Sequence, residues 1–307
     1  MSRTRIPYGV SNFEKLITEN YYYVDKSEYI ERLEKLNEPI LFFLRPRKFG
    51  KSLWVSLLQY YYGLDQKENF DTLFGETYIG KNPTPLANKY YMVKFDFSNI
   101  RTASNEDTFQ GFTLKIITGI MDFQTAYGIF SEGEMREILG RQGGNEVYSL
   151  FQSLFRAKRN DQKLFILIDE YDHFTNELVS FNLTEFRNIV SRNGYVRKFY
   201  EAIKESVGNG IVDRFFATGV TPVTLDSMTS GFNIGSDLTT SPEFNEMLGF
   251  NGDEVRKMLL DLNLNGGEAM YETLESYYNG SLFSAKATTK MFNSNMVVNY
   301  LNEYQKN

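Results

Sequence analysis

Four short, largely apolar runs restrict the fold of this 307-residue sequence more than any other feature. The runs are PILFFL (39–44), YYMVKFDFS (90–98), KLFILIDEYD (163–172) and VDRFFATGV (212–220). Apolar runs of this length, bounded by polar residues, are typical of strands that are buried in a parallel sheet. Because stretches of helical periodicity separate them, the sequence predicts an α/β fold in which helices cover both faces of the sheet.

The remaining segments suggest three parts. We expect an N-terminal arm at 1–38, an α/β core at 39–240, and a helical C-terminal subdomain or lid at 241–307. Ser11 and Glu14 have capping-box spacing, which predicts that a helix of the arm begins at Ser11. A second helix of the arm is predicted to begin near residue 27. Further helices are predicted at 51–63, 105–130, 145–159 and 184–207.

The stretch FLRPRKFGKSL (43–53) matches the second half of a phosphate-binding loop, G-x-x-x-x-G-K-[ST]. Gly50, Lys51 and Ser52 fill the second half, but Arg45 and Pro46 stand where the first glycine and its neighbour would be. A lone Gly-Lys-Ser is weak evidence. Here it follows a predicted strand and opens a predicted helix, so helix N–H groups would face the phosphates. Lys51 would then reach the β- and γ-phosphates of ATP, and the Ser52 hydroxyl would bind Mg²⁺.

Two acids follow the strongest predicted strand, LFILI (164–168). Asp169 and Glu170 would lie at the carboxyl edge of the sheet, where open α/β sheets bind ligands. Asp169 is predicted to hold Mg²⁺, and Glu170 to orient and deprotonate the attacking water. The alternative, that both acids merely begin a solvated loop, stays open.

A polar residue also ends the fourth predicted strand. Thr218 precedes Gly219 and is a candidate catalytic residue that would bond the γ-phosphate or the attacking water. A threonine before a glycine is equally typical of an ordinary turn.

Composition limits the other functional classes. The net charge is −6, whereas proteins that bind duplex nucleic acid normally present a basic face, so direct nucleic-acid binding is not favoured. The absence of cysteine and the single histidine, His173, exclude thiolate and histidine-cluster metal sites. The N-terminus has no apolar signal core and no run approaches 18 apolar residues, so we expect a cytoplasmic protein without a membrane segment.

Taken in order along nearly the whole chain, several stretches resemble the predicted AAA-ATPase-like proteins of bacteria and some eukaryotes. Many of those proteins join this domain to a C-terminal nuclease-like domain of the PD-(D/E)xK class. The matching stretches are IPYGVSNFEKLITENYYYVDKS, FLRPRKFGKSL, VKFDFS, LFILIDEYD, FATGVTPVTLDSMTSGFNIGSDLT, GF followed by DEVRKML, and YYNG with MFNSNMVVNYL.

The resemblance implies a P-loop NTPase fold of the additional-strand, AAA-like kind, a three-layer sandwich with a parallel sheet and a C-terminal helical subdomain. It also implies that RPRKFGKS is the family's own form of the loop. Arg45 or Arg47 would then supply positive charge to the phosphates, unless both are ordinary surface arginines. The implied nucleotide-binding residues of the loop are Arg45, Pro46, Arg47, Lys48, Phe49, Gly50, Lys51, Ser52 and Leu53.

By the same resemblance, YVDK in the arm is expected to approach the adenine. The candidate contacts are Tyr23, Val24, Asp25 and Lys26, although the stretch could equally be a simple helix entry.

The sequence also departs from the family pattern. No stretch has the signature of the nuclease half, so a nuclease-like partner would lie outside this chain. Ser281 stands where the family tends to have an aromatic residue, and Ser294 where it tends to have proline. No arginine follows the fourth predicted strand where a ring-forming arginine finger is expected, so we do not predict a hexameric ring.

Two functional classes remain in competition. The leading prediction is an ATP-binding, ATP-hydrolysing regulatory domain that uses ATP and Mg²⁺ to switch its helical end or a partner. The alternative is a nucleotide-independent interaction scaffold with a degenerate loop. Glu170 separates the two, because a scaffold does not need an acid at that position.

Overall fold

Five parallel strands form the central sheet of the computed structural model, which describes residues 5–158, 161–191, 193–227, 235–264 and 267–306. The strands are β1 (Ile40–Leu44), β2 (Tyr91–Asp96), β3 (Leu164–Asp169), β4 (Val212–Gly219) and β5 (Ser236–Asp237). Their order is β2-β3-β4-β1-β5, so β4 lies between β1 and β3. This inserted strand confirms the predicted additional-strand α/β fold.

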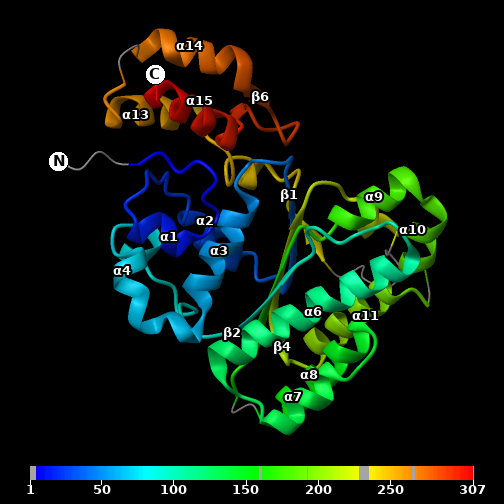
Figure 1. Cartoon of the computed structure of the whole chain (residues 1–307). Helices are drawn as coiled ribbons and strands as arrows, with labels where there is room; N and C mark the ends of the chain where they lie inside the picture. The colour runs from blue at the N-terminus through cyan, green and yellow to red at the C-terminus, as the bar shows by residue number, and fades with distance from the viewer. Residues whose placement is uncertain (1–4, 159–160, 192, 228–234, 265–266, 307) are drawn as a thin grey trace.

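Helices cover both faces of the sheet, which makes the core a three-layer sandwich (Figure 1). The α-helices are α1 (Phe13–Thr18), α2 (Glu28–Lys35), α3 (Lys51–Tyr62), α4 (Phe70–Phe74), α5 (Tyr78–Lys81), α6 (Asn105–Tyr127), α7 (Glu132–Leu139), α8 (Gly144–Lys158), α9 (His173–Phe181), α10 (Leu183–Val190), α11 (Tyr195–Gly208), α12 (Val223–Ser227), α13 (Gly252–Asp261), α14 (Gly267–Tyr278) and α15 (Ser294–Lys306). Two 3₁₀ helices, η1 (Leu64–Asn69) and η2 (Pro242–Phe244), and an antiparallel pair of short strands, β6 (Asn279–Ser281) and β7 (Met291–Phe292), complete these elements.

The strands supply two apolar clusters because successive side chains point to opposite faces. Ile166 and Ile168 of β3 pack on one face with α6, α8, α9, α10 and α11. Leu167, between them, packs on the other face with α1 through α5. All six residues of β3 are buried, as a central strand of a doubly covered sheet requires.

A third apolar cluster joins the two ends of the chain. Ile6 of the predicted arm packs with residues of α13, α14 and α15, and Tyr22 and Val24 pack against the same cluster. The arm therefore shares a core with the C-terminal helices, which lie together beyond one end of the sheet (Figure 1). The proposed boundaries at residues 38 and 240 stay predictions.

Some predicted elements differ from the observed ones. The helix of the arm is capped by Asn12, whose side chain accepts from Lys15 N, and not by Ser11. The helix predicted at 184–207 is two helices, α10 and α11, which meet near Gly194. A Cβ on Gly194 would lie 2.0 Å from the Ile189 carbonyl oxygen, so the chain needs glycine there. Within the described ranges, no helix is long and apolar enough to cross a membrane.

Candidate functional site

The predicted phosphate loop connects β1 to α3 at the carboxyl edge of the sheet. Arg45 N donates to Gly219 O at 3.1 Å and so extends the pairing of β1 with β4 by one residue. The loop then turns through left-handed backbone at Lys48 (φ 72°) and Gly50 (φ 93°) before α3 begins. The first N–H groups of a helix have no partner within the helix, so the start of α3 presents donors to the loop.

Lys51 is buried at the start of α3, with only 4 % of its surface exposed. Its ammonium donates to Pro46 O at 3.2 Å, across the loop, and lies 3.9 Å from the Glu170 carboxylate. Burial lowers the pKa of Lys51, while the nearby carboxylates of Glu170 and Asp169 oppose that shift. The cation is therefore held inside the loop by its neighbours.

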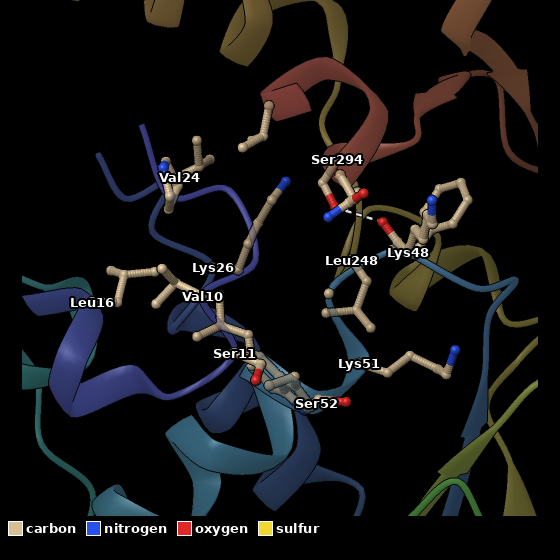
Figure 2. Close-up of a pocket in the computed structure, with 18 of the residues that line it drawn as sticks. Val10, Ser11, Leu16, Val24, Lys26, Lys48, Lys51, Ser52, Leu248 and Ser294 are labelled. Atoms are coloured by element: carbon tan, nitrogen blue, oxygen red, sulfur yellow. Dashed lines mark hydrogen bonds between the residues drawn. The ribbon is translucent and has the colours of Figure 1, made fainter. Parts of the chain in front are cut away.

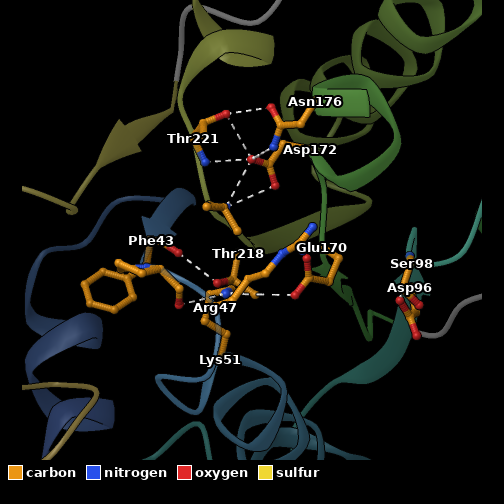
Figure 3. Close-up of polar contacts among 12 residues, drawn as sticks. Phe43, Arg47, Lys51, Asp96, Ser98, Glu170, Asp172, Asn176, Thr218 and Thr221 are labelled. Atoms are coloured by element: carbon orange, nitrogen blue, oxygen red, sulfur yellow. Dashed lines mark hydrogen bonds and ion pairs between the residues drawn. The ribbon is translucent and has the colours of Figure 1, made fainter. Parts of the chain in front are cut away.

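The two predicted acids reach one cavity because the backbone bends between them. Asp169 is the last residue of β3, and Glu170 adopts left-handed backbone, with φ 53°. A continuing strand would have turned the two side chains to opposite faces. Both instead line a cavity of about 240 Å³ with Ser52 and Arg47, and Asp96 and Ser98 form a further wall of it. Figure 3 shows Arg47, Glu170, Asp96 and Ser98 among these residues.

Asp169 is the residue best suited to hold a metal ion. Its Oδ1 is buried without a hydrogen-bond partner, and burial raises the pKa of its carboxyl to about 6, with a hydrogen bond from Ser52 opposing the shift. In the described part of the chain, no group of three or more His, Cys, Asp or Glu residues is arranged as a metal cage. One carboxylate beside one hydroxyl instead fits Mg²⁺, which takes few protein ligands and completes its shell with phosphate oxygens and water.

A second cavity, of about 280 Å³, adjoins the loop on the side of the arm. Figure 2 shows the arm, the start of α3 and the start of α15 around this cavity. Tyr23, Val24 and Lys26 of the arm line it, and their expected contact with the adenine stays a prediction. Asp25 is not among the residues that line it, because its carboxylate accepts from Ser27 N and Tyr78 N. The loop contributes Lys48, Phe49, Gly50, Lys51, Ser52 and Leu53.

The prediction that Arg45 faces the phosphates is not met. Its guanidinium is buried, with 1 % of the residue exposed, and donates to the carbonyls of Leu44, Thr239 and Phe244. The side chain therefore points toward the segment after β5. Of the two arginines, Arg47 is the one that lines a cavity, on the side of Asp169 and Glu170.

Thr218 lies beside the loop, but its hydroxyl is already engaged. It donates to Phe43 O at 2.8 Å, which joins β4 to β1 (Figure 3). In this conformation the Thr218 hydroxyl therefore donates its proton to a neighbouring strand of the sheet. It does not donate it toward a γ-phosphate, as the sequence had suggested.

Asp172 is a residue of the site whose importance the sequence did not reveal. It is fully buried and accepts from Val220 N at 3.0 Å, Thr221 N at 2.6 Å and Asn176 Nδ2 at 2.7 Å (Figure 3). These bonds fix the turn after β3 to the end of β4. The repeated acid in IDEYD is the signal that could have indicated it.

The C-terminal part also contacts the loop directly. Asn293 Nδ2 donates to Arg47 O at 3.2 Å, and Ser294 Oγ and Asn295 N donate to Lys48 O at 3.2 and 3.1 Å. Sequence reasoning singled out Ser294 only as a departure from a family pattern. In the structure, its hydroxyl supports the strained Lys48 turn of the loop.

The strand order, the glycine-lysine-serine loop after β1 and the acids at the end of β3 together define a P-loop NTPase fold with an additional strand. A family model described as "Predicted AAA-ATPase" matches residues 7–229, and the chain belongs to this family.

Two known proteins show further similarity. The "Uncharacterized protein in vnfD 5'region" of Azotobacter chroococcum mcd 1 is 25% identical over 304 residues, which are 95% of this chain and 51% of that protein. This chain therefore spans about half the length of that relative. A chain in the structure of Drosophila ORC bound to AT-rich DNA and Cdc6 is 12% identical, with 95% of this chain and 94% of that chain covered and a TM-score of 0.28. That score is too low to support an argument, so the fold assignment rests on the strand order.

Proposed function

We propose that this domain binds ATP together with Mg²⁺ and hydrolyses it. The observation that supports this best is the convergence of four side chains from two segments: Lys51 and Ser52 open α3, while Asp169 ends β3 and Glu170 follows it. A cation, a hydroxyl and two carboxylates beside a helix N-terminus are the groups that phosphoryl transfer needs. An interaction scaffold would not need to keep Asp169 buried with an unpartnered oxygen.

The two cavities suggest how the nucleotide lies. The larger one, between the arm and the C-terminal helices, has an apolar lining that suits the adenine, with Tyr23 and Val24 at the arm. The phosphates would follow the loop from Lys48 to Ser52, where backbone N–H groups and the Lys51 ammonium meet them. The γ-phosphate would then lie toward the smaller cavity, which contains Glu170.

Glu170 is proposed as the general base. Its left-handed backbone turns the carboxylate toward the cavity and away from the sheet, where it can accept a proton from the attacking water. Lys51 would balance the charge that develops on the phosphate oxygens. Bound Mg²⁺, held by Asp169 and Ser52, would supply further positive charge to the β- and γ-phosphates.

We place this activity in a regulatory domain of the cytoplasm whose partner is a nuclease-like domain or another protein outside this chain. The contacts of Asn293 and Ser294 with the loop carbonyls support such a role, because a change at the loop would reach the C-terminal helices directly.

Lys51→Ala tests the binding proposal by isothermal titration with ATP, ADP and GTP in Mg²⁺. Removing a charge-assisted hydrogen bond to phosphate should weaken ATP binding by about tenfold or more. Lys81→Ala, at an exposed lysine paired with Glu76, is the matched control and should bind as the parent does. A parent protein that binds none of the three nucleotides would favour the scaffold function.

A further inference from the structure

Arg45 stands where a phosphate loop would have its first glycine, yet its side chain leaves the loop. Nη1 donates to Leu44 O and Thr239 O, both at 2.9 Å, and Nη2 donates to Phe244 O at 2.8 Å. Two of these acceptors lie almost 200 residues further along the chain. A single guanidinium thus joins the end of β1 to the segment that follows β5.

Two aromatic rings enclose the same guanidinium. Its central carbon lies 4.0 Å from the ring centroid of Phe43 and 4.0 Å from that of Phe283. Burial lowers the pKa of Arg45 to about 9, and the Asp237 carboxylate opposes this shift. Among the described residues, no carboxylate lies close enough to form an ion pair with it. Carbonyl dipoles and ring faces, which suit a planar cation, therefore stabilise the buried charge.

Phe283 contacts the loop at two points. It packs against Arg45 at the start of the loop and edge-to-face against Phe49, with 5.2 Å between ring centroids, just before Gly50. Its own backbone is fixed, because Phe283 N donates to the buried Asn245 Oδ1 at 3.1 Å. The Phe283 side chain thus contacts the first and the fifth residue of the loop, Arg45 and Phe49.

We propose that Arg45 is a positioning residue that holds the phosphate loop in its binding shape by fixing it to residues 239–245 and to Phe283, without touching the nucleotide. A guanidinium can do this at a glycine position because its side chain turns away from the loop and leaves the backbone open to phosphate. The proposal rests on the nucleotide binding proposed above. It implies that the loop binds phosphates well only while the C-terminal segment is docked.

Two variants from opposite sides of this contact test the proposal. Arg45→Lys keeps the charge, but one ammonium cannot reach the separated carbonyls and lie flat between two rings. Phe283→Leu leaves Arg45 intact and removes one ring. Arg256→Lys is the matched control, because Arg256 stacks on Tyr271 at 3.6 Å and forms its ion pairs with Asp253 and Glu268, in the C-terminal helices and away from the loop.

Binding of ATP, ADP and adenosine is measured by titration, from the change in fluorescence of Trp54. Trp54 is the single tryptophan of the chain and lines the larger cavity. We expect Arg45→Lys and Phe283→Leu each to weaken ATP and ADP binding by about tenfold, and the double variant to lose little more, because both act through one contact. Adenosine, which carries no phosphate, should bind both variants within about twofold of the parent affinity.

Three outcomes would overturn the proposal. Variants that bind ATP and ADP as the parent does, even with a lower melting temperature, would show that Arg45 only packs the core. An equal loss for ATP, ADP and adenosine would indicate a general loosening of the cavity. Either of these results, with a parent protein that binds ATP, would disprove the positioning role of Arg45 alone. The third outcome, a parent protein that binds no nucleotide, would disprove the proposed function as well.

Discussion

Asp169 shows at the scale of one residue that a candidate metal ligand can cost stability. Its carboxyl is buried with 4 % of the residue exposed, and burial raises its pKa from 3.8 to about 6. An acid whose pKa is higher in the folded protein binds its proton more tightly there than in the unfolded chain. The Asp169 carboxyl therefore stabilises the folded protein at acid pH, where it is protonated. This contribution to the free energy of unfolding is lost as the pH rises from about 4 to about 6.

Asp169→Asn should remove this pH dependence. We expect the free energy of unfolding of the variant to exceed that of the parent by up to ~3 kcal/mol at pH 7 without metal, and the gap to close toward pH 4. Urea denaturation across this pH range checks it, with Asp122→Asn, at an exposed position of α6, as the control. Parallel profiles for the parent and Asp169→Asn would contradict this account of the buried carboxyl.

At the scale of residues, the sequence predicts which side chains lie together where the signal is local, while the roles of these side chains stay predictions. Lys51, Ser52, Asp169 and Glu170 were singled out because a strand and a motif lie next to each other, and the structure brings all four together. Arg45 was misjudged because its direction depends on partners about 200 residues away, which no local spacing encodes.

At the scale of elements, the turn after β3 and the end of β4 form one unit. Asp172 accepts from the backbone of residues 220 and 221, and Tyr171 N donates to Thr218 O at 3.0 Å. Gly219 lies against this turn. A Cβ added there would lie 2.3 Å from Asp172 Oδ1 and 2.4 Å from Tyr171 Cδ1, closer than packed atoms can approach.

Gly219→Ala should therefore destabilise the protein by about 1–3 kcal/mol, because the methyl group must displace a buried carboxylate or a buried ring. Gly208→Ala is the control: it lies at the end of α11 with no atom within 4 Å of its added Cβ, and should be neutral or slightly stabilising. Thermal or urea unfolding measures both. Equal stability of the two variants would mean that the turn is not packed as described.

The elements themselves were predicted unevenly. Four strands were found because continuous apolar runs mark buried parallel strands, whereas β5 has only two residues, 236 and 237, and no such run. The split between α10 and α11 was missed because the apolar periodicity continues across Gly194. Pairing across the sheet fixes short strands such as β5, so local sequence alone does not mark them.

At the scale of the whole molecule, the two ends of the chain stabilise each other. Lys26 forms a 2.5 Å ion pair with Glu254 at the start of α13, and Tyr22 OH donates to Asp261 at 2.8 Å. Ile6 is buried in the same cluster as the C-terminal helices. The arm and these helices should therefore open as one cooperative unit.

Ile6→Ala tests this cooperativity. Loss of a buried isoleucine side chain typically costs about 2–5 kcal/mol, and here the cost should appear in the C-terminal cluster. Hydrogen exchange should quicken in α13, α14 and α15 and stay unchanged in α6 and α8. Leu260→Ala, at a leucine of α13 with 74% exposure, is the control and should leave exchange near that of the parent. Unchanged protection of α13 through α15 in Ile6→Ala would show that the two ends open independently.

The central claim is that the acids at the end of β3 serve ATP hydrolysis, and Glu170→Gln tests it most directly. Glutamine keeps the size of the side chain but accepts no proton, so the variant should bind ATP with Mg²⁺ as the parent does and lose turnover by a factor of about 10²–10⁴. Phosphate release measured beside ATP titration separates the two effects, with Glu205→Gln, at an exposed glutamate of α11, as the control. The account predicts a variant that binds and does not turn over. A parent that binds ATP and releases phosphate no faster than Glu170→Gln would contradict it.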